Sequence, residues 1–308
     1  MSTVPVCKFP ATVVCVDDSP EMLSFLSDMI DSKYKVKCFD NEFNAISHLR
    51  DYKTSFKPAT FIKEFPHEYN DTHSHILSDL NIQSILDIYK NPDRHNEISV
   101  LVVDYKMPEF SGVDVLELVD NPSFSRIMLT SEMTYEESVN TFNKNLINKF
   151  IKKTDGAMVD RLNSYIETLN DEFFKKITDV VLNHLEQHNK LPLSDALFSY
   201  FFNDIVKEHA IVEHYLIDKN GSLLLIDESG NQLYLVIHTT KSLNEFVETY
   251  SDDPAFKKAV DLVSSKEKIP FFGLEQTADK VDVSNLNKYL YTPKVLYGRE
   301  NYYYTLIK

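Results

Sequence analysis

Five short segments with the pattern of strands, most of them followed by a helical pattern, constrain the fold of this 308-residue chain more than any other feature. The segments are residues 12–16, 34–39, 100–103, 126–129 and 149–152. Their length and their β-branched and apolar residues are typical of strands. Strands that alternate with helices form a parallel, doubly wound sheet, so the sequence predicts an α/β fold with five parallel strands.

Polar residues stand at the carboxyl ends of four of these segments. Asp17 and Asp18 follow the first segment, and Asp104, Thr130 and Lys153 follow the last three. A parallel sheet brings its carboxyl ends to one edge, so these side chains should gather there. Three carboxylates repel one another unless a hard cation such as Mg²⁺ lies among them. With a lysine and a hydroxyl nearby, the cluster suits phosphoryl transfer, and Asp104 is the expected nucleophile.

A more specific signal lies in residues 104–112. They read Asp-Tyr-Lys-Met-Pro-Glu-Phe-Ser-Gly and match a D-x-x-M-P-x-x-x-G pattern, while residues 13–20 contain a strand that ends in paired acids. In these segments the chain resembles the CheY-like receiver domains of two-component response regulators. The resemblance implies Asp104 as the phosphoacceptor and Mg²⁺ as the cofactor. Asp18 would bind the ion directly and Asp17 through water, and the backbone carbonyl of Lys106 would be a further ligand.

Three more positions would take part in phosphorylation. By resemblance, Thr130 would contact the phosphoryl group, Lys153 would pair with it, and Phe150 would be the aromatic side chain that changes position. The family usually has proline after the lysine, whereas this chain has Thr154. Lys152 is therefore an alternative active-site lysine, and Lys153 is preferred because Phe150 stands three residues before it.

The separation of Asp18 from Asp104 indicates an insertion. It is about twice the separation usual in the family, and residues 56–97 show a helical patch and no obvious strand. The insertion contains three histidines, His67, His73 and His75. Because no cysteine or acid stands at a convincing ligand spacing, surface histidines are favoured over a metal site.

Three regions are expected along the chain. A receiver domain would span residues 1–165, a linking helix 166–190, and a smaller α+β output domain 191–308. The turn pair Asn220-Gly221 lies between two apolar runs, which predicts a hairpin. The output domain should therefore contain an antiparallel sheet.

A helical pattern crosses the junction between the two domains. Its apolar stripe consists of Leu162, Ile166, Leu169, Phe173, Ile177 and Val180. Such a stripe can pack on its own domain or on a second copy of the chain, and both readings stay open. The second reading is a possible homodimer built partly on Phe173, Ile177 and Val180.

Composition limits the classes of partner. The net charge is −15, and acidic residues outnumber basic ones in both halves of the chain. This excess of negative charge weighs against binding to the phosphate backbone of a nucleic acid. No apolar run reaches the roughly 18 residues that a membrane-spanning helix needs, and no secretory leader is evident, so we expect a cytoplasmic protein with no membrane partner. Cys7, Cys15 and Cys38 lack C-x-x-C spacing, which favours free thiols over zinc or a disulfide framework.

These features predict a response regulator that receives a phosphoryl group from a histidine kinase or a phosphotransfer protein. The output domain would control binding of a downstream protein target, and the chain would not be an enzyme toward a separate substrate. The layout, an enlarged receiver before an acidic α+β domain, weakly resembles the atypical response regulators of the Legionella quorum-sensing type.

Two alternatives remain for the output domain. It could bind nucleic acid through the tyrosines of residues 289–304, although packing of these rings within a sheet is favoured over base stacking. It could also be an enzyme acting on a nucleotide or a small metabolite, which would require a concave pocket with convergent titratable groups.

Overall fold

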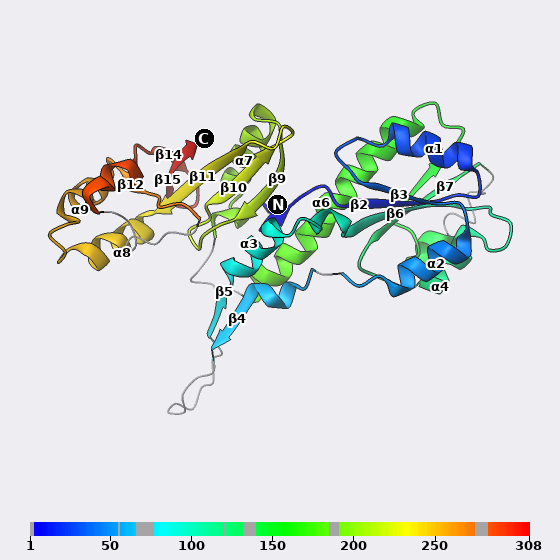
Figure 1. The fold of residues 1–308 in the computed structure, drawn as a ribbon, viewed down its shortest axis with the longest axis horizontal. Coiled ribbons are helices and arrows are strands. Elements are labelled where there is room, and N and C mark those ends of the chain that lie inside the picture. The colour runs from blue at the N-terminus through cyan, green and yellow to red at the C-terminus, as the bar shows by residue number, and fades with distance from the viewer. Residues whose placement is uncertain are drawn as a thin grey trace. The chain divides into compact units, whose positions relative to one another are not determined.

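The computed structural model describes residues 3–54, 56–65, 77–119, 121–131, 140–184, 191–274 and 283–308. The chain forms two compact units (Figure 1). The first, called here the parallel-sheet unit, comprises Phe9–Pro58 and Asn91–Ile177. The second, called the antiparallel-sheet unit, comprises Met1–Lys8, Ala59–Lys90 and Thr178–Lys308.

The parallel-sheet unit contains the five-stranded sheet that the sequence predicts. Its strands are β2 (Thr12–Val16), β3 (Val36–Phe39), β6 (Ile98–Asp104), β7 (Ser125–Thr130) and β8 (Lys149–Lys152). They lie in the order β3-β2-β6-β7-β8, and each neighbouring pair is parallel. The order reverses at β2, so β2 and β6 lie next to each other and bring Asp17 and Asp104 to the same edge.

Helices cover both faces of this sheet. They are α1 (Pro20–Met29), α2 (Glu42–Asp51), α4 (Gly112–Val119) and α6 (Met158–His184). Val13 and Cys15 of β2 share a buried cluster with residues of α1 and α6, whereas Val14 and Val16 share one with residues of α2 and α4. Strand β2 reads as continuously apolar because both of its faces are covered.

The predicted stripe of α6 packs within its own chain. Leu162, Ile166 and Leu169 are buried in the cluster that includes α1. Farther along, Phe173 lies 6.2 Å from Phe56 between ring centroids and is 7% exposed, and Ile177 is 8% exposed. Two of the three side chains assigned to a dimer seam are thus buried in the monomer, which contradicts that hypothesis for them. Val180 is 40% exposed.

The antiparallel-sheet unit contains a six-stranded sheet. Its strands are β1 (Cys7–Lys8), β9 (Ile211–Leu216), β10 (Leu223–Asp227), β11 (Gln232–Thr239), β14 (Lys294–Tyr297) and β15 (Asn301–Ile307). They lie in the order β1-β9-β10-β11-β15-β14, with antiparallel pairs throughout. The predicted turn joins β9 to β10, where Gly221 has a φ of 100°, a conformation that favours glycine. The antiparallel sheet of the output domain is confirmed.

Helices and short elements flank this sheet. They are η4 (Pro192–Ser194), α7 (Ala196–Glu208), α8 (Thr240–Tyr250), α9 (Lys257–Ser264), β12 (Ile269–Pro270), η6 (Val283–Tyr289) and β13 (Leu290–Tyr291). Successive tyrosines of β15 point to opposite faces. Tyr302 contacts Phe198 of α7, whereas Tyr303 lies in the cluster formed with α8 and α9, and both are at most 6% exposed. The tyrosine run is therefore core packing at these two positions.

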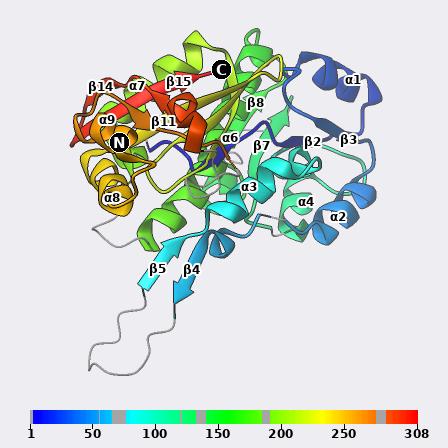
Figure 2. The same cartoon turned by 60° about the vertical axis from the view of Figure 1, so that its left-hand side comes forward.

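The insertion is not purely helical. It contains η1 (Pro58–Phe61), β4 (Ile62–Phe65), β5 (Leu77–Leu80), α3 (Ile82–Lys90) and η2 (Arg94–Asn96). Figure 2 shows β4 and β5 side by side, and they pair as antiparallel strands. The expectation of no strand in this segment was wrong, because four-residue strands such as Leu-Ser-Asp-Leu are too short to show a clear alternation. The histidines at 67, 73 and 75 lie outside the described residues.

The two compact units have different bounds from the domains expected from the sequence. Residues 59–90 belong to the antiparallel-sheet unit, where the ring of Tyr89 lies 5.4 Å from that of Tyr215 and its hydroxyl accepts a hydrogen bond from Gln232 at 2.8 Å. Strand β1 also joins this unit, by pairing with β9. No helix in the part of the chain described is long and apolar enough to cross a membrane.

Tyr89 should stabilise the antiparallel-sheet unit and not the parallel-sheet unit. We expect Tyr89→Ala to lower the unfolding free energy by about 1 to 3 kcal/mol, because it removes an aromatic pair and a hydrogen bond. Native-state hydrogen exchange should speed up in β9 and β10 and stay unchanged in β2 and β6. Tyr200→Ala, at a position 71% exposed in α7, is the control and should have little effect. Faster exchange confined to β2 and β6 would contradict the assignment.

Candidate functional site

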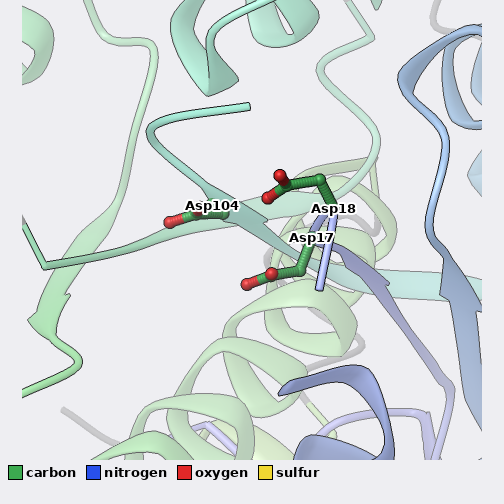
Figure 3. Close-up of side chains that lie close together, drawn as sticks. All are labelled: Asp17, Asp18 and Asp104. Atoms are coloured by element: carbon green, nitrogen blue, oxygen red, sulfur yellow. The ribbon is translucent and has the colours of Figure 1, made fainter. Parts of the chain in front are cut away.

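Three carboxylates meet at the carboxyl ends of β2 and β6. Asp17, Asp18 and Asp104 each place an oxygen within 4.8 Å of the others (Figure 3). Asp17 and Asp104 are 1% and 6% exposed, whereas Asp18 is exposed. The sequence predicted this gathering from the parallel topology alone.

Lys153 completes the cluster. Its Nζ lies 2.7 Å from Oδ2 of Asp17 and 3.0 Å from Oδ1 of Asp104. Its backbone N–H donates to the carbonyl of Thr130 at 2.8 Å, which fixes the residue beside the end of β7. Lys152 is exposed, so Lys153 is the lysine at the carboxylates.

The turn after Lys153 is held without the usual proline. The N–H of Asp155 donates to the carbonyl of Lys152 at 3.0 Å, and the carboxylate of Asp155 accepts from the N–H of Ala157, also at 3.0 Å. The same carboxylate pairs with Arg161 of α6 at 3.1 Å. Thr154 therefore occupies a turn that the following acid and α6 stabilise.

Burial sets the electrostatics of the site. It raises the pKa of Asp104 above its usual value, and the nearby Asp17 carboxylate adds to the rise although Lys153 opposes it. Burial alone would lower the pKa of Lys153, but hydrogen bonds to Asp17 and Asp104 outweigh it and raise the pKa. Three carboxylates face one ammonium, and carboxylate oxygens are the ligands that Mg²⁺ prefers. The residues therefore fit a divalent cation.

Asp17 is the most restrained of the three acids. Its Oδ1 accepts from the N–H of Ser19 at 3.0 Å while its Oδ2 accepts from Lys153. Its own N–H donates to the carbonyl of Phe39 in β3 at 3.2 Å. Ser19 also caps α1 by accepting from the N–H of Met22 at 3.2 Å. Sequence reasoning missed this bond between Ser19 and Asp17.

The loop after β6 is shaped by close contacts. The N–H of Gly112 donates to the carbonyl of Tyr105 at 2.8 Å, and Met107 is buried in the core. A Cβ at Gly112 would overlap the carbonyl oxygen of Asp104 and lie 3.0 Å from its carbonyl carbon. Glycine ends the D-x-x-M-P-x-x-x-G segment because the backbone of Asp104 occupies that space.

The remaining predicted residues lie on β7, on β8 and in the loop after β6. Thr130 is 1% exposed at the end of β7, and Phe150 of β8 packs partly buried against the core that includes α4. Lys106 is exposed in the loop after β6. Sequence reasoning missed Glu42, a buried residue of α2 whose Oε1 accepts from the N–H of Glu109 at 3.3 Å and so helps to hold that loop.

Known structures share the fold of this chain. The structure is similar to the Legionella pneumophila response regulator LqsR, with a TM-score of 0.73 and 25% identity over 99% of this chain and 89% of LqsR. It also aligns with a CheY-like receiver domain protein from Methanospirillum hungatei JF-1 at 16% identity over 54% of this chain and 98% of that chain, with a TM-score of 0.37. No protein-family model and no curated protein matches the chain.

The parallel-sheet unit has the fold of a response-regulator receiver domain and is called the receiver domain from here on. The similarity to LqsR extends over nearly the whole chain, so it includes the antiparallel-sheet unit as well as the receiver domain. The receiver domain of this chain retains both acids after β2, the acid after β6, and a lysine after β8.

Gly112→Ala should destabilise the receiver domain. The added methyl group would meet the Asp104 backbone, which cannot move without shifting β6, so we expect a loss of about 1 to 3 kcal/mol or more. Chemical denaturation would measure the loss. Gly156→Ala is the matched control, because its Cβ would have no atom within 4 Å. Equal stability of the two variants would show that the space beside Asp104 is not limiting.

Asp104→Asn should stabilise the receiver domain when metal is removed. The pKa of Asp104 is raised in the folded state above 3.8, so the contribution of this group is most favourable below pH 3.8 and is lost as the pH rises through the folded-state pKa. In EDTA at about pH 7, the variant should therefore melt at a higher temperature than the wild type. The difference should shrink on acidification toward pH 3.8. A variant that melts lower at neutral pH would contradict this.

Proposed function

We propose that this protein is a two-component response regulator that accepts a phosphoryl group on Asp104. The observation that carries the proposal is the position of Asp104, nearly buried at the end of β6 with Lys153 3.0 Å away and two further acids within 4.8 Å. The donor would be the phosphohistidine of a histidine kinase or of a phosphotransfer protein. Support comes from the receiver fold and from the similarity to LqsR along almost the whole chain.

The residues divide the chemistry of transfer among them. An oxygen of Asp104 forms a bond to phosphorus as the phosphorus–nitrogen bond of the donor breaks, and the imidazole nitrogen keeps the electron pair. Lys153 can move its ammonium group from the carboxylate to an incoming phosphoryl oxygen. Thr130, at the end of the next strand, can donate its hydroxyl to another. Mg²⁺, held by Asp17, Asp18, Asp104 and the carbonyl of Lys106, would neutralise phosphoryl charge.

Phosphorylation is proposed to act on the rest of the chain through Thr130 and Phe150. The new phosphoryl group adds charge and acceptor oxygens at the sheet edge, which draws Thr130 inward. Phe150, only partly buried against the core, has room to change position in response. The output domain would then change its affinity for a downstream protein target, in a signalling role such as quorum sensing, in the cytoplasm.

Nucleic acid is the less favoured target. The net charge is −15, and Tyr302 and Tyr303, two of the rings that could stack on bases, are buried. A catalytic role of the output domain is also less favoured, because both ring nitrogens of the buried histidine of β11 have partners within the fold. Nδ1 of His238 lies 3.1 Å from Oγ of Ser242 and its Nε2 lies 2.9 Å from the carbonyl of Pro270, and Ser242 is engaged in the capping box of α8. A homodimer would need a surface other than Phe173 and Ile177.

Asp104→Asn should abolish phosphorylation. With acetyl phosphate as donor and Mg²⁺ present, the wild type should gain an acid-labile phosphate detectable as one added phosphoryl mass, and chelation by EDTA should prevent it. The variant removes the nucleophilic oxygen and should gain none, while keeping the circular dichroism of the wild type.

The control is Asp28→Asn, which alters an exposed carboxylate of α1 away from the cluster and should be labelled like the wild type. Undiminished labelling of Asp104→Asn would remove Asp104 from the role of nucleophile. Labelling of the wild type that persists in EDTA would remove the metal from the proposal.

A further inference from the structure

Two cysteines stand directly opposite each other next to the phosphorylation site. Cys15 of β2 and Cys38 of β3 are in register in the parallel sheet. Neighbouring strands lie about 4.7 to 4.9 Å apart, and disulfides join Cα atoms about 4.4 to 6.8 Å apart. In parallel strands, residues in register also point to the same face of the sheet. The backbone therefore places these thiols at a separation that a disulfide can bridge.

The side chains face each other as the backbone suggests. The Sγ of Cys38 donates to the carbonyl of Leu23 in α1 at 3.8 Å, and Cys15 lies in the same buried cluster as Leu23. Both thiols therefore point to the face covered by α1.

The pair combines an accessible thiol with a protected one. Cys38 is exposed, whereas Cys15 is buried. The hydrogen bond with Cys15 lowers the pKa of Cys38 to about 7, although partial burial opposes the shift. A thiol with these properties reacts first with an oxidant, and a neighbouring thiol can then resolve the product.

We propose that Cys15 and Cys38 form a reversible intrachain disulfide in the receiver domain under peroxide. The peroxide oxidises the Cys38 sulfur to a sulfenic acid and is itself reduced to water. The Cys15 sulfur then attacks the Cys38 sulfur, so that the sulfur–sulfur bond forms, the sulfur–oxygen bond breaks, and hydroxide leaves as water with the proton of Cys15. A dithiol reductant reverses the reaction by thiol exchange.

The disulfide acts on the phosphorylation site through the backbone. Phe39 follows Cys38 in β3, and its carbonyl accepts a hydrogen bond from the N–H of Asp17 at 3.2 Å. Asp17 lies two residues after Cys15. The Cα atoms of disulfides are most often about 5.5 to 6 Å apart, wider than the roughly 4.8 Å between neighbouring strands, so forming the bond shifts β2 against β3 just before this contact. The carboxylate of Asp17, held by Ser19 and Lys153, shifts with its backbone. Oxidation therefore slows phosphorylation, a consequence that rests on the function proposed above.

The test treats the full-length protein with hydrogen peroxide, alkylates the remaining thiols and identifies linked peptides by mass spectrometry. The expected product is one Cys15–Cys38 link that a dithiol removes. Cys7→Ser should form the same link, because Cys7 is buried and takes no part, and Cys38→Ser should form none. A link that includes Cys7, or a Cys38 sulfinic acid without any link, would overturn the proposal.

The effect of the disulfide on phosphorylation is measured separately, as the rate of labelling by acetyl phosphate before and after oxidation. Oxidation should slow labelling about fivefold or more in the wild type and in Cys7→Ser, and leave Cys38→Ser unchanged. Equal rates for the linked and reduced proteins would overturn the coupling. If the reduced protein takes up no phosphate, the proposed function fails, while the mass of the linked peptides still decides the disulfide.

Discussion

The balance of charge at the end of the parallel sheet is the constraint on which this structure depends. Two carboxylates, Asp17 and Asp104, are almost completely removed from solvent, and a buried charge is costly unless a partner compensates it. Lys153 supplies one positive charge to both, which leaves the cluster negative when Asp18 is included. Burial raises the pKa of Asp104, and the nearby Asp17 carboxylate adds to the rise. A cluster of carboxylates with this charge balance suits a divalent cation.

The backbone around the site is arranged to keep those charges in place. Ser19 joins the start of α1 to Asp17, Glu42 joins the start of α2 to the loop after β6, and Gly112 lets that loop return over the carbonyl of Asp104. Each of these contacts lies at a helix start. The helices that cover the sheet therefore also position the loops that carry the acids, so packing and chemistry depend on the same elements.

The chain alternates between its two units. Residues 1–8 and 59–90 belong to the antiparallel-sheet unit, so the chain passes between the units beside residues 8, 58, 90 and 177. Near each of these points the receiver domain contributes one ring to a single aromatic cluster, made of Phe9, Phe56, His95 and Phe174. The Asn170 side chain also bonds to the carbonyl of Phe9 and the N–H of Ala11. All of these contacts lie within the receiver domain.

The sequence by itself determined the receiver domain, because its strands are short and four of the five are followed by residues whose chemistry matters at a sheet edge. The sequence pattern alone identified Asp17, Asp18 and Asp104. Only the tertiary structure separated Lys153 from Lys152, because one turn decides which of two adjacent lysines faces the carboxylates. The tertiary structure also assigned residues 59–90 to the antiparallel-sheet unit. It buried most of the apolar stripe of α6 within the same chain. Local periodicity tells which face of an element is apolar, whereas the partner that covers this face lies far away in sequence and is selected by packing.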